Sequence, residues 1–536
     1  MPHCKNCQNQ FEITSEDRAY YKKISVPEPT LCPDCRLQRR MAWRNERNLY
    51  HRTCDFSGKK FVSVFSQDKP FKVYSPNIWW SDKWEALKYG QDMDFSRPFF
   101  EQFKELLCKV PLLGIINVNA ENSDYTNQGY SNKNCYMTIT ADFCEDCYYV
   151  DSSFSSKNCT DCLSIHKCEL CYSCLDCANC YGCFFCQGCH NCNDTWFSTL
   201  CRGCSNCFGC TGLRNKQYYA YNKPLSKEEW TEKFSELVLS HSLIEDIKKQ
   251  ANEERLKVPH PFATMHGCQD CTGDFLTSCK NAVECYDGQD IEDSRRVILV
   301  PLAIRDCFDC LGIGGGELIY ESHSTGPAYN AKFCAWCWND VANLSYCFLC
   351  CNNSKNLFGC VGLKHKEYCI LNKQYKKDEY EKLLEKIIDL MKKTAEYGEF
   401  FPMEMSLFNY EESIAEQYFP RTGKHQKTSP VPPDSFKIPE TFDEVQSDIC
   451  NKTLYCEVTG KPYKIIKKEF DFYKKMKLPL PRRCPDQRNL DRLADRNPRQ
   501  LFSRVCAKCN APIQTTYSPD RPEMVYCEQC YLDTVY

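Results

Sequence analysis

The sequence predicts a mainly β protein with two cysteine-rich β-solenoid segments, similar to parallel β-helices and accompanied by helical braces. Treble-clef or zinc-ribbon modules are expected to flank them at both termini. Three observations predict this fold class: cysteines recur in a fixed phase, C-x2-C pairs stand near both ends, and long segments repeat at fixed offsets. Identical residues in fixed columns are typical of stacked repeats, and paired C-x2-C motifs are typical of structural zinc sites.

Length and composition narrow the class of protein. The chain has 536 residues, of which 44 are cysteine, and a formal net charge of −3. It is long enough for several domains, so its cysteines need not compensate for a small core. Its start lacks the apolar segment of a signal peptide, and the longest apolar segment, 110–118, is too short to span a bilayer. We therefore expect a cytoplasmic protein without a membrane partner, whose cysteines are metal ligands or packed thiols.

The first solenoid is predicted from the spacing of its cysteines. Every cysteine from Cys135 to Cys210 lies at a multiple of three, a phase that neither a helix nor a single strand explains. A fifteen-residue repeat fits residues 132–206, with cysteine in the thirteenth column, aspartate or asparagine in the fifteenth, and cysteine directly after it. We expect one coil per repeat, with like residues stacked about 4.8 Å apart and the aspartates and asparagines at turns.

These repeated cysteines have more than one interpretation. Cysteine is a small and commonly buried residue that can fill a narrow interior. Alternatively, successive pairs converge on a metal or an iron–sulfur cluster, and the candidate ligands are then Cys144, Cys147, Cys159 and Cys162. Disulfide or redox chemistry is a third interpretation. Packing is favoured, because the position that matches Cys207 in the second region holds Leu357, which cannot be a ligand.

Two internal duplications organise the chain. The terminal modules match at an offset of 452, which aligns Cys4 with Cys456, Cys32 with Cys484 and Cys54 with Cys506. The ends of the two solenoids match at an offset of 150, and each is followed by a helical segment with apolar residues at three-to-four spacing.

The predicted segments are a zinc module (1–84), a helical connector and solenoid cap (85–131), the first solenoid (132–223), a helical brace (224–262), the second solenoid (263–372), a second brace (373–424), a proline-rich linker (425–440) and a second zinc module (441–536).

Each terminal module is predicted to hold one structural Zn²⁺ ion. Two C-x2-C pairs supply four thiolates and complete a tetrahedron, leaving no open position for a catalytic water. The predicted ligands are Cys4, Cys7, Cys32 and Cys35 at one end and Cys506, Cys509, Cys527 and Cys530 at the other. We infer that the two modules are complementary, and that each has kept a different one of two ancestral sites.

Arginines cluster in the segment that follows Cys35 and in its copy near Cys484. A helix rich in arginine beside a zinc knuckle can bind phosphates, but no base-reading motif accompanies these segments. The alternative is that the arginines brace neighbouring carboxylates. The candidate nucleic-acid-binding residues are Arg36, Arg39, Arg40, Arg44, Arg488 and Arg492.

The most specific motifs of the chain are CKNC, PTLCPDCRLQRRMAWRNERNLYHRTC, FKVYSPNIWWSDKW, RPFFEQFKEL, CRGCSNCFGCTGLRNKQYYAYNKPLSKEEW and FGCVGLKHKEYCILNKQY. Together they resemble a group of uncharacterised cysteine-rich zinc-ribbon proteins of candidate phyla radiation bacteria. The resemblance covers most of the chain and implies no known activity. The resemblance implies a C-x2-C pattern after the position of Cys54. This chain departs from that pattern, because it has Ser57, Ser75 and Ile78 at these positions. We therefore expect no metal at that second site of the first module.

The expected function is that of a zinc-binding structural scaffold or binding protein, non-catalytic, whose partner is an unidentified protein or nucleic acid. Two alternatives stay open: nucleic-acid binding through the arginine-rich segments, and metal storage or redox chemistry through the solenoid cysteines. We favour a protein that is not an enzyme, because the ten histidines form no ligand set and the sequence has no phosphate-binding loop.

Overall fold

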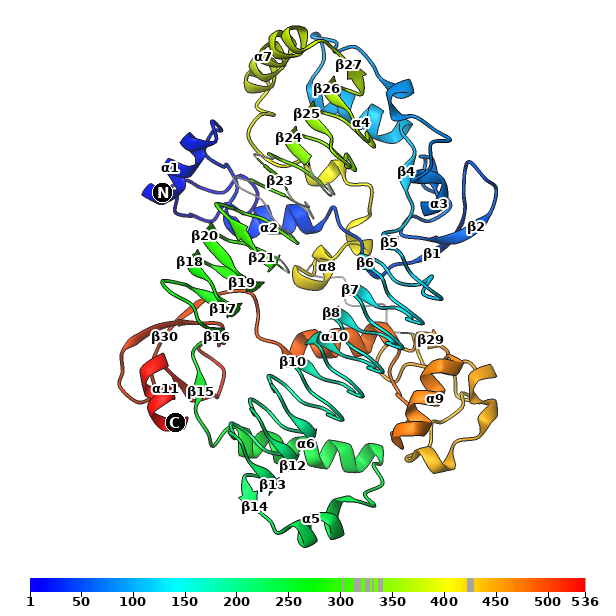
Figure 1. The fold of residues 1–536 in the computed structure, drawn as a ribbon, viewed down its shortest axis with the longest axis vertical. Coiled ribbons are helices and arrows are strands. Elements are labelled where there is room, and N and C mark those ends of the chain that lie inside the picture. Colours follow the sequence, from blue (N-terminus) through cyan, green and yellow to red (C-terminus); the bar gives the residue numbers. More distant parts are fainter. Residues whose placement is uncertain are drawn as a thin grey trace. The chain divides into compact units, whose positions relative to one another are not determined.

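The computed structural model describes residues 1–300, 303–312, 320–322, 328–329, 332–335, 341–421 and 429–535. Parts of the predicted second solenoid, the end of the second brace and residues 425–428 of the predicted linker lie outside these ranges. The protein is a β-solenoid of about 19 turns with few helices, which confirms the predicted fold class (Figure 1). In the described part of the chain, no helix combines the length and the apolar character that crossing a bilayer requires.

The chain divides into two compact units. Unit 1 comprises Met1–Ile115, Ala263–Pro420 and Arg499–Leu501, and unit 2 comprises Ile116–Phe262, Arg421–Pro498 and Phe502–Tyr536. The first terminal module therefore folds with the second solenoid, and most of the second terminal module folds with the first solenoid. Sequence order alone does not predict this exchange.

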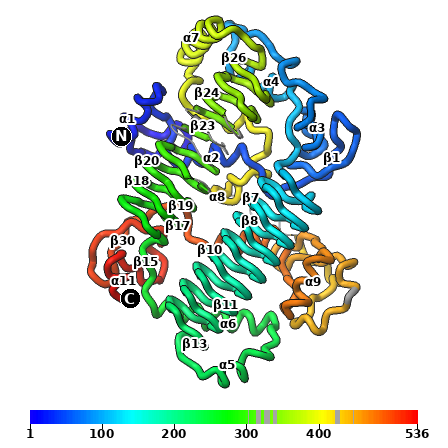
Figure 2. Tube along the Cα trace, in the orientation of Figure 1, coloured from blue at the N-terminus to red at the C-terminus, as the bar shows by residue number. Residues whose placement is uncertain are grey.

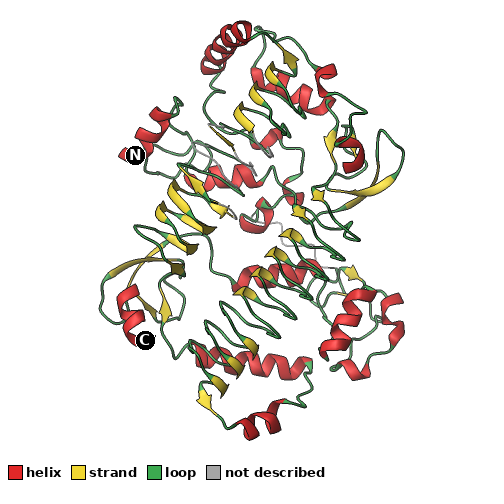
Figure 3. Cartoon of the chain, viewed as in Figure 1, coloured by secondary structure: helices red, strands yellow, loops and turns green. Residues whose placement is uncertain are grey.

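The first solenoid is built from short parallel strands. One sheet contains β5 (Asn117–Val118), β6 (Gly129–Tyr130), β7 (Ile139–Asp142), β8 (Asp151–Phe154), β9 (Leu163–His166) and β10 (Leu175–Ala178), and the next contains β11 (Asn193–Trp196), β12 (Ser205–Phe208), β13 (Gln217–Ala220) and the antiparallel β14 (Lys223–Pro224). Figure 2 shows the successive coils of this segment, and Figure 3 shows how short its strands are. The coils begin before residue 132, inside the predicted connector, where the repeat lacks cysteine.

The coil has twelve residues, so the predicted fifteen-residue repeat is wrong. Tyr148 pairs with Tyr136 on one side and with Thr160 on the other, and the Leu163 to Leu175 register has the same step. Cys144 and Cys159 are consequently not in the same column, whereas Cys147 and Cys159 are. Both periods are multiples of three, so the cysteine phase that suggested fifteen residues fits twelve equally well.

Every third residue turns a corner of the coil. The aspartates and asparagines of the predicted turn column have left-handed backbone, for example Asp146 (φ 52°), Asp161 (φ 56°) and Asn191 (φ 54°). Asparagine, aspartate and glycine tolerate this conformation better than other residues. The corner N–H groups bond the coil before, as Asp161 N does to Tyr148 O at 3.0 Å. The predicted role of this column in turns is thus confirmed.

The second solenoid has less regular coils. Its steps are eleven residues from Met265 to Leu276, twelve from Gly273 to Cys285, and thirteen from Ala342 to Lys355. Single-residue insertions of this kind shift the cysteine phase, which explains the mixed phases in the sequence. The described strands are β16 (Met265–His266), β17 (Gly273–Thr277), β18 (Lys280–Val283), β19 (Cys285–Gln289), β20 (Ile291–Arg295), β21 (Ile298–Val300), β22 (Ile304–Arg305), β23 (Ala328–Tyr329), β24 (Val341–Ser345), β25 (Lys355–Phe358), β26 (Glu367–Ile370) and β27 (Lys373–Gln374).

From α1 and α9 onward, the terminal modules have the same order of elements at a spacing of 452 residues, and β28 and β29 correspond to an isolated bridge between His3 and Gln10. The first contains α1 (Ser15–Lys23), α2 (Pro33–Met41), β1 (Tyr50–Thr53), β2 (Lys60–Ser63), β3 (Val73–Tyr74) and α3 (Pro76–Trp79). The second contains β28 (Leu454–Tyr455), β29 (Pro462–Tyr463), α9 (Lys467–Met476), α10 (Pro485–Asp495), β30 (Phe502–Val505), β31 (Pro512–Thr515), β32 (Val525–Tyr526) and α11 (Glu528–Val535). Helices α2 and α10 both begin at a proline that follows a cysteine.

The remaining elements connect and cover these parts. Unit 1 adds η1 (Ala86–Tyr89), α4 (Phe99–Lys109), β4 (Leu112–Leu113), α7 (Lys377–Lys393), η2 (Met403–Met405), η3 (Tyr410–Glu412) and α8 (Ala415–Tyr418). Unit 2 adds α5 (Lys227–Phe234), α6 (His241–Arg255), β15 (His260–Pro261), η4 (Phe442–Glu444) and η5 (Ser447–Asn451). Helices α5, α6 and α7 occupy the two predicted braces. In unit 2, α6 and α9 pack on the aromatic side chains of the solenoid surface.

Candidate metal centres

The first predicted metal site is assembled as expected. Cys4 and Cys7 lie in a turn closed by a hydrogen bond from Gln8 N to Cys4 O of 3.0 Å, while Cys32 precedes α2 and Cys35 lies in its first turn. The four sulfurs lie within 4.8 Å of one another. The Cys7 and Cys32 sulfurs are 3.7 Å apart, close to the edge of about 3.8 Å that a tetrahedron with Zn–S bonds of about 2.3 Å has.

The second predicted metal site has the same construction. Cys506 and Cys509 lie in the turn between β30 and β31, and Cys527 and Cys530 lie at the start of α11. Their sulfurs also lie within 4.8 Å of one another, and Cys509 and Cys527 are separated by 3.7 Å. Each of the two groups could therefore hold one metal ion.

Backbone groups favour one thiolate at each site, whereas burial raises the pKa of Cys32, Cys35 and Cys530. Burial opposes ionisation of the Cys4 thiol, but backbone N–H donors, led by that of Cys32, outweigh it and lower its pKa to about 6. The Cys506 thiol has the same balance, with Cys527 N–H as the leading donor and a pKa of about 6. Because the thiolate is the ligand form of cysteine, these turns are suited to cation binding.

Each module also contains positions that match the quartet of the other module. These positions keep the turn, but they do not keep all four cysteines. Cys54 lies in the same kind of turn, in which Gly58 N donates to Cys54 O at 2.9 Å, and its sulfur accepts from Ser75 N at 3.3 Å. Cys456 and Cys484 likewise remain, with Thr459 beside Cys456. Within the described residues, only the two complete quartets gather as candidate metal sites.

The four solenoid cysteines that the sequence offered as alternative metal ligands do not form a candidate metal site. Each of them directly follows a left-handed corner residue. Cys144 and Cys147 lie three residues apart in one coil, and Cys159 and Cys162 three residues apart in the next. All four are buried in the solenoid interior, and no metal-ligand group includes them among the described residues. The prediction of a metal centre at these positions is not supported by the geometry.

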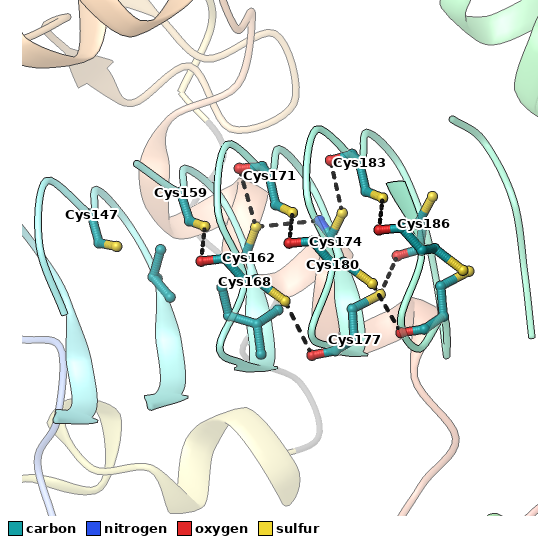
Figure 4. Packing of buried hydrophobic residues seen from close by; sticks show 14 of the residues in the cluster. Cys147, Cys159, Cys162, Cys168, Cys171, Cys174, Cys177, Cys180, Cys183 and Cys186 are labelled. Carbon is teal, nitrogen blue, oxygen red and sulfur yellow. Dashed lines mark hydrogen bonds between the residues drawn. The ribbon is translucent and has the colours of Figure 1, made fainter. Parts of the chain in front are cut away.

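The interior thiols act as packed hydrogen-bond donors (Figure 4). The Cys174 sulfur lies 3.5 Å from Tyr172 O and 3.2 Å from Cys183 O, and the Cys186 sulfur lies 3.5 Å from Phe184 O and 3.0 Å from Thr195 O. Burial raises the pKa of both thiols well above its usual value. Since a thiolate would face two carbonyl oxygens without a proton to share, these positions favour the protonated thiol over a metal-bound thiolate.

Other small residues replace cysteine in the same columns. Thr195 stands between Cys183 and Cys207, and Ser198 stands between Cys186 and Cys210; both Thr195 and Ser198 are fully buried. The coil interior is therefore narrow and selects residues by size. This observation supports the packing interpretation of the cysteines.

The packed thiols lead to a prediction about reactivity. In a short pulse of iodoacetamide on the native protein, we expect alkylation of partly exposed cysteines such as Cys108, Cys268 and Cys450, and none at Cys174 or Cys186. Buried thiols are inert because both access and ionisation are suppressed. Peptide mass spectrometry before and after unfolding in denaturant would measure this difference. Rapid native alkylation of Cys174 would contradict the packed interior.

The candidate nucleic-acid-binding arginines are buried and paired, which contradicts that assignment. Their residues are at most 7% exposed. In unit 1, an Arg36 Nη atom lies 3.0 Å from the Asp309 carboxylate, and Arg39 lies 2.6 Å from Glu321 and 2.7 Å from Glu399. The remaining pairs join Arg40 with Glu321 at 3.8 Å, Arg44 with Glu46 at 2.6 Å, and both Arg488 and Arg492 with Asp161.

Unit 2 repeats the arrangement of unit 1. Arg488 and Arg492 are the counterparts of Arg36 and Arg40 at the offset of 452, and their common partner Asp161, like Asp309, occupies a left-handed corner of a coil. We call each arginine–carboxylate cluster a clasp: Arg36 with Asp309 in unit 1, and Arg488 and Arg492 with Asp161 in unit 2. Each clasp joins a terminal module to a solenoid.

Burial and neighbouring arginines shift the pKa values of the carboxyl groups in and beside the clasps. Burial raises the pKa of Asp309, but Arg36 and Arg296 outweigh it and lower the pKa to about 2. In unit 2 burial raises the pKa of Glu469 to about 7, although Arg488 opposes the shift. Sequence reasoning missed Asp161 and Asp309 as partners. The predicted turn column included Asp161, but it did not extend to Asp309, and nothing in the sequence distinguishes either residue from the other aspartates.

Comparison with models of protein families and with curated proteins found no match for this chain.

Proposed function

We propose that this protein is a zinc-stabilised, non-catalytic scaffold whose terminal modules fix the two solenoids for binding a partner. The proposal rests mainly on one observation: α2 and the cysteine before it contribute both to a candidate metal site and to the attachment of the solenoid. Cys32 and Cys35 at its start complete a four-sulfur site, and Arg36, next along the chain, reaches the solenoid carboxylate of Asp309. Metal binding and solenoid attachment thus use one helix.

The two modules are proposed to be diverged copies of a treble-clef zinc fold. In support, each quartet draws one pair from a turn and one pair from the start of a helix. Four thiolates without a carboxylate or an open ligand position favour structural Zn²⁺. Reduced thiols throughout the solenoid interior also fit a reducing compartment such as the cytoplasm.

The two alternative functions have less support. The arginines predicted to bind nucleic acid are buried, either in the clasps or in ion pairs with glutamates. They therefore offer no donors to phosphates at the surface. Metal storage in the solenoid would require deprotonation of thiols that donate to backbone carbonyls, as Cys174 and Cys186 do. The partner of the scaffold is proposed to be another macromolecule of unknown identity.

Elemental analysis tests this proposal. Protein purified without oxygen and without added metal is expected to contain two zinc ions per chain, one for each quartet. Inductively coupled plasma mass spectrometry, normalised to amino-acid analysis, would give the ratio. Iron, or a metal content well above two ions per chain, would favour the storage or redox alternative and overturn the scaffold proposal.

A further inference from the structure

A hollow of about 690 Å³ lies on the first terminal module of unit 1. Its lining comes from separate segments: Arg52 and Asp55 near β1, Gln67 and residues 69–72 of the following loop, η1 with Lys88 and Tyr89, and the end of α4 with Cys108 and Lys109. Small-molecule sites have volumes of about 300–1,000 Å³. The hollow therefore has the size of a site for a ligand as large as a nucleotide.

The hollow is strongly cationic although the whole chain is slightly acidic. Five lining side chains are cations, and Asp55 is the one carboxylate among the lining residues. Buried Arg52 neutralises Asp55 at 3.0 Å and also donates to Phe71 O at 2.9 Å. It therefore forms part of the structural wall and is not a free cation.

Three further lysines line the hollow without an ion pair. Lys69 pairs with Glu412 at 2.8 Å, but Lys72, Lys88 and Lys109 form no ion pair with any carboxylate that the structure describes. Lys109 lies 3.4 Å from Gln91 Oε1, and its charge, after that of Arg97, contributes to the lowered pKa of Glu105 one turn earlier on α4. Like charges around one hollow repel one another, and a bound anion converts this repulsion into attraction. The buried arginines of the clasps, by contrast, all lie beside carboxylates.

We propose that this hollow binds a phosphorylated small molecule of nucleotide size that carries at least two phosphate charges. Lysine ammonium groups bind phosphate as point charges without demanding one geometry, and three of them match a di- or triphosphate better than a single carboxylate. The partly exposed Tyr89 in the lining adds apolar surface for the organic part. This site is separate from the metal quartets and from the clasps, so it goes beyond the scaffold role.

Isothermal titration calorimetry of the full chain with ATP, and separately with inorganic pyrophosphate, tests the proposal. At about 0.15 M salt, where exposed charges are screened beyond about 8 Å, we expect saturable binding of ATP and weaker binding of pyrophosphate. The double variant Lys72→Gln/Lys88→Gln is expected to raise the dissociation constant by at least about tenfold, which corresponds to about 1.4 kcal/mol.

The matched control is Lys59→Gln/Lys60→Gln. These two exposed lysines lie at the β1–β2 turn, outside the hollow, and their replacement changes the net charge equally. We expect it to leave the dissociation constant unchanged within about twofold, since exposed charges at a distance contribute little. Circular dichroism would show that both variants fold.

Ligand protection of Cys108 provides a second measurement. This partly exposed thiol lines the hollow, so saturating ATP is expected to slow its alkylation and leave that of Cys450 unchanged. The proposal is overturned if neither probe binds saturably, if both double variants weaken binding equally, or if a short single-stranded oligonucleotide binds there more tightly than ATP. The last result would indicate a nucleic-acid surface.

Discussion

Replacement of Arg488 by alanine is expected to lower the free energy of unfolding of unit 2 by about 3–5 kcal/mol, because it leaves buried carboxylates without their partner. Asp161 has a 3% exposed side chain and Glu469 a fully buried one, and both contact the Arg488 guanidinium. Arg492 still contacts Asp161 at 2.9 Å, so the larger loss falls on Glu469. Burial already raises its pKa to about 7 beside Arg488, and without Arg488 the pKa rises further, so that Glu469 must take up a proton to stay buried. Urea denaturation and hydrogen exchange of the α10 amides would measure the effect.

The matched control is Arg483→Ala, which removes an arginine just before α10. Arg483 pairs with Glu457 and Asp491, but its side chain is 45% exposed, and exposed pairs contribute about 0–1 kcal/mol. We expect a small loss of stability and unchanged exchange in the solenoid. If the two replacements destabilised the protein equally, the clasp would not be the attachment between module and solenoid.

The sequence allowed the fold class and the metal quartets to be predicted because both are determined locally. A C-x2-C turn forms within a few residues, so Cys4 and Cys7 could be paired from spacing alone. The three-residue phase likewise reflects a local corner conformation, as at Asp161. The length of the coil, in contrast, depends on which residues pair across coils, and both twelve and fifteen residues preserve the phase.

The clasps could not be predicted for a different reason. Arg36 and Asp309 are separated by 273 residues, and their pairing follows from the association of the first module with the second solenoid. Arginine-rich segments on solvated helices and on buried helices have the same composition. Only the long-range packing distinguishes an arginine that binds a carboxylate in the core from one that is free to bind phosphate.

Replacement of Cys32 by serine is expected to remove one metal ion per chain and to unfold the first terminal module locally. Four sulfurs close the first quartet, and a serine hydroxyl is a poor substitute for a thiolate ligand of zinc. Binding of structural zinc contributes about 10–16 kcal/mol in isolated zinc-finger peptides, which is comparable to the whole stability of a typical domain, about 5–15 kcal/mol. Metal analysis, together with hydrogen exchange of α1 and α2, would detect the change.

The chain contains its own control for this experiment. Cys484 occupies the equivalent position at the offset of 452, precedes the equivalent helix α10 and is also buried, but it belongs to no complete quartet. Cys484→Ser is therefore expected to keep both metal ions and to cost only the small penalty of a buried hydroxyl, about 1–3 kcal/mol. Loss of one metal ion in both variants would show that the copy at Cys456 and Cys484 still binds metal. Loss in neither would show that the Cys4 quartet is a cluster of packed thiols, like the interior of the solenoids.

Since α2 carries both Cys35 and Arg36, we expect the Cys32 variant also to expose the Arg36 clasp, which faster exchange in the coil around Asp309 would reveal.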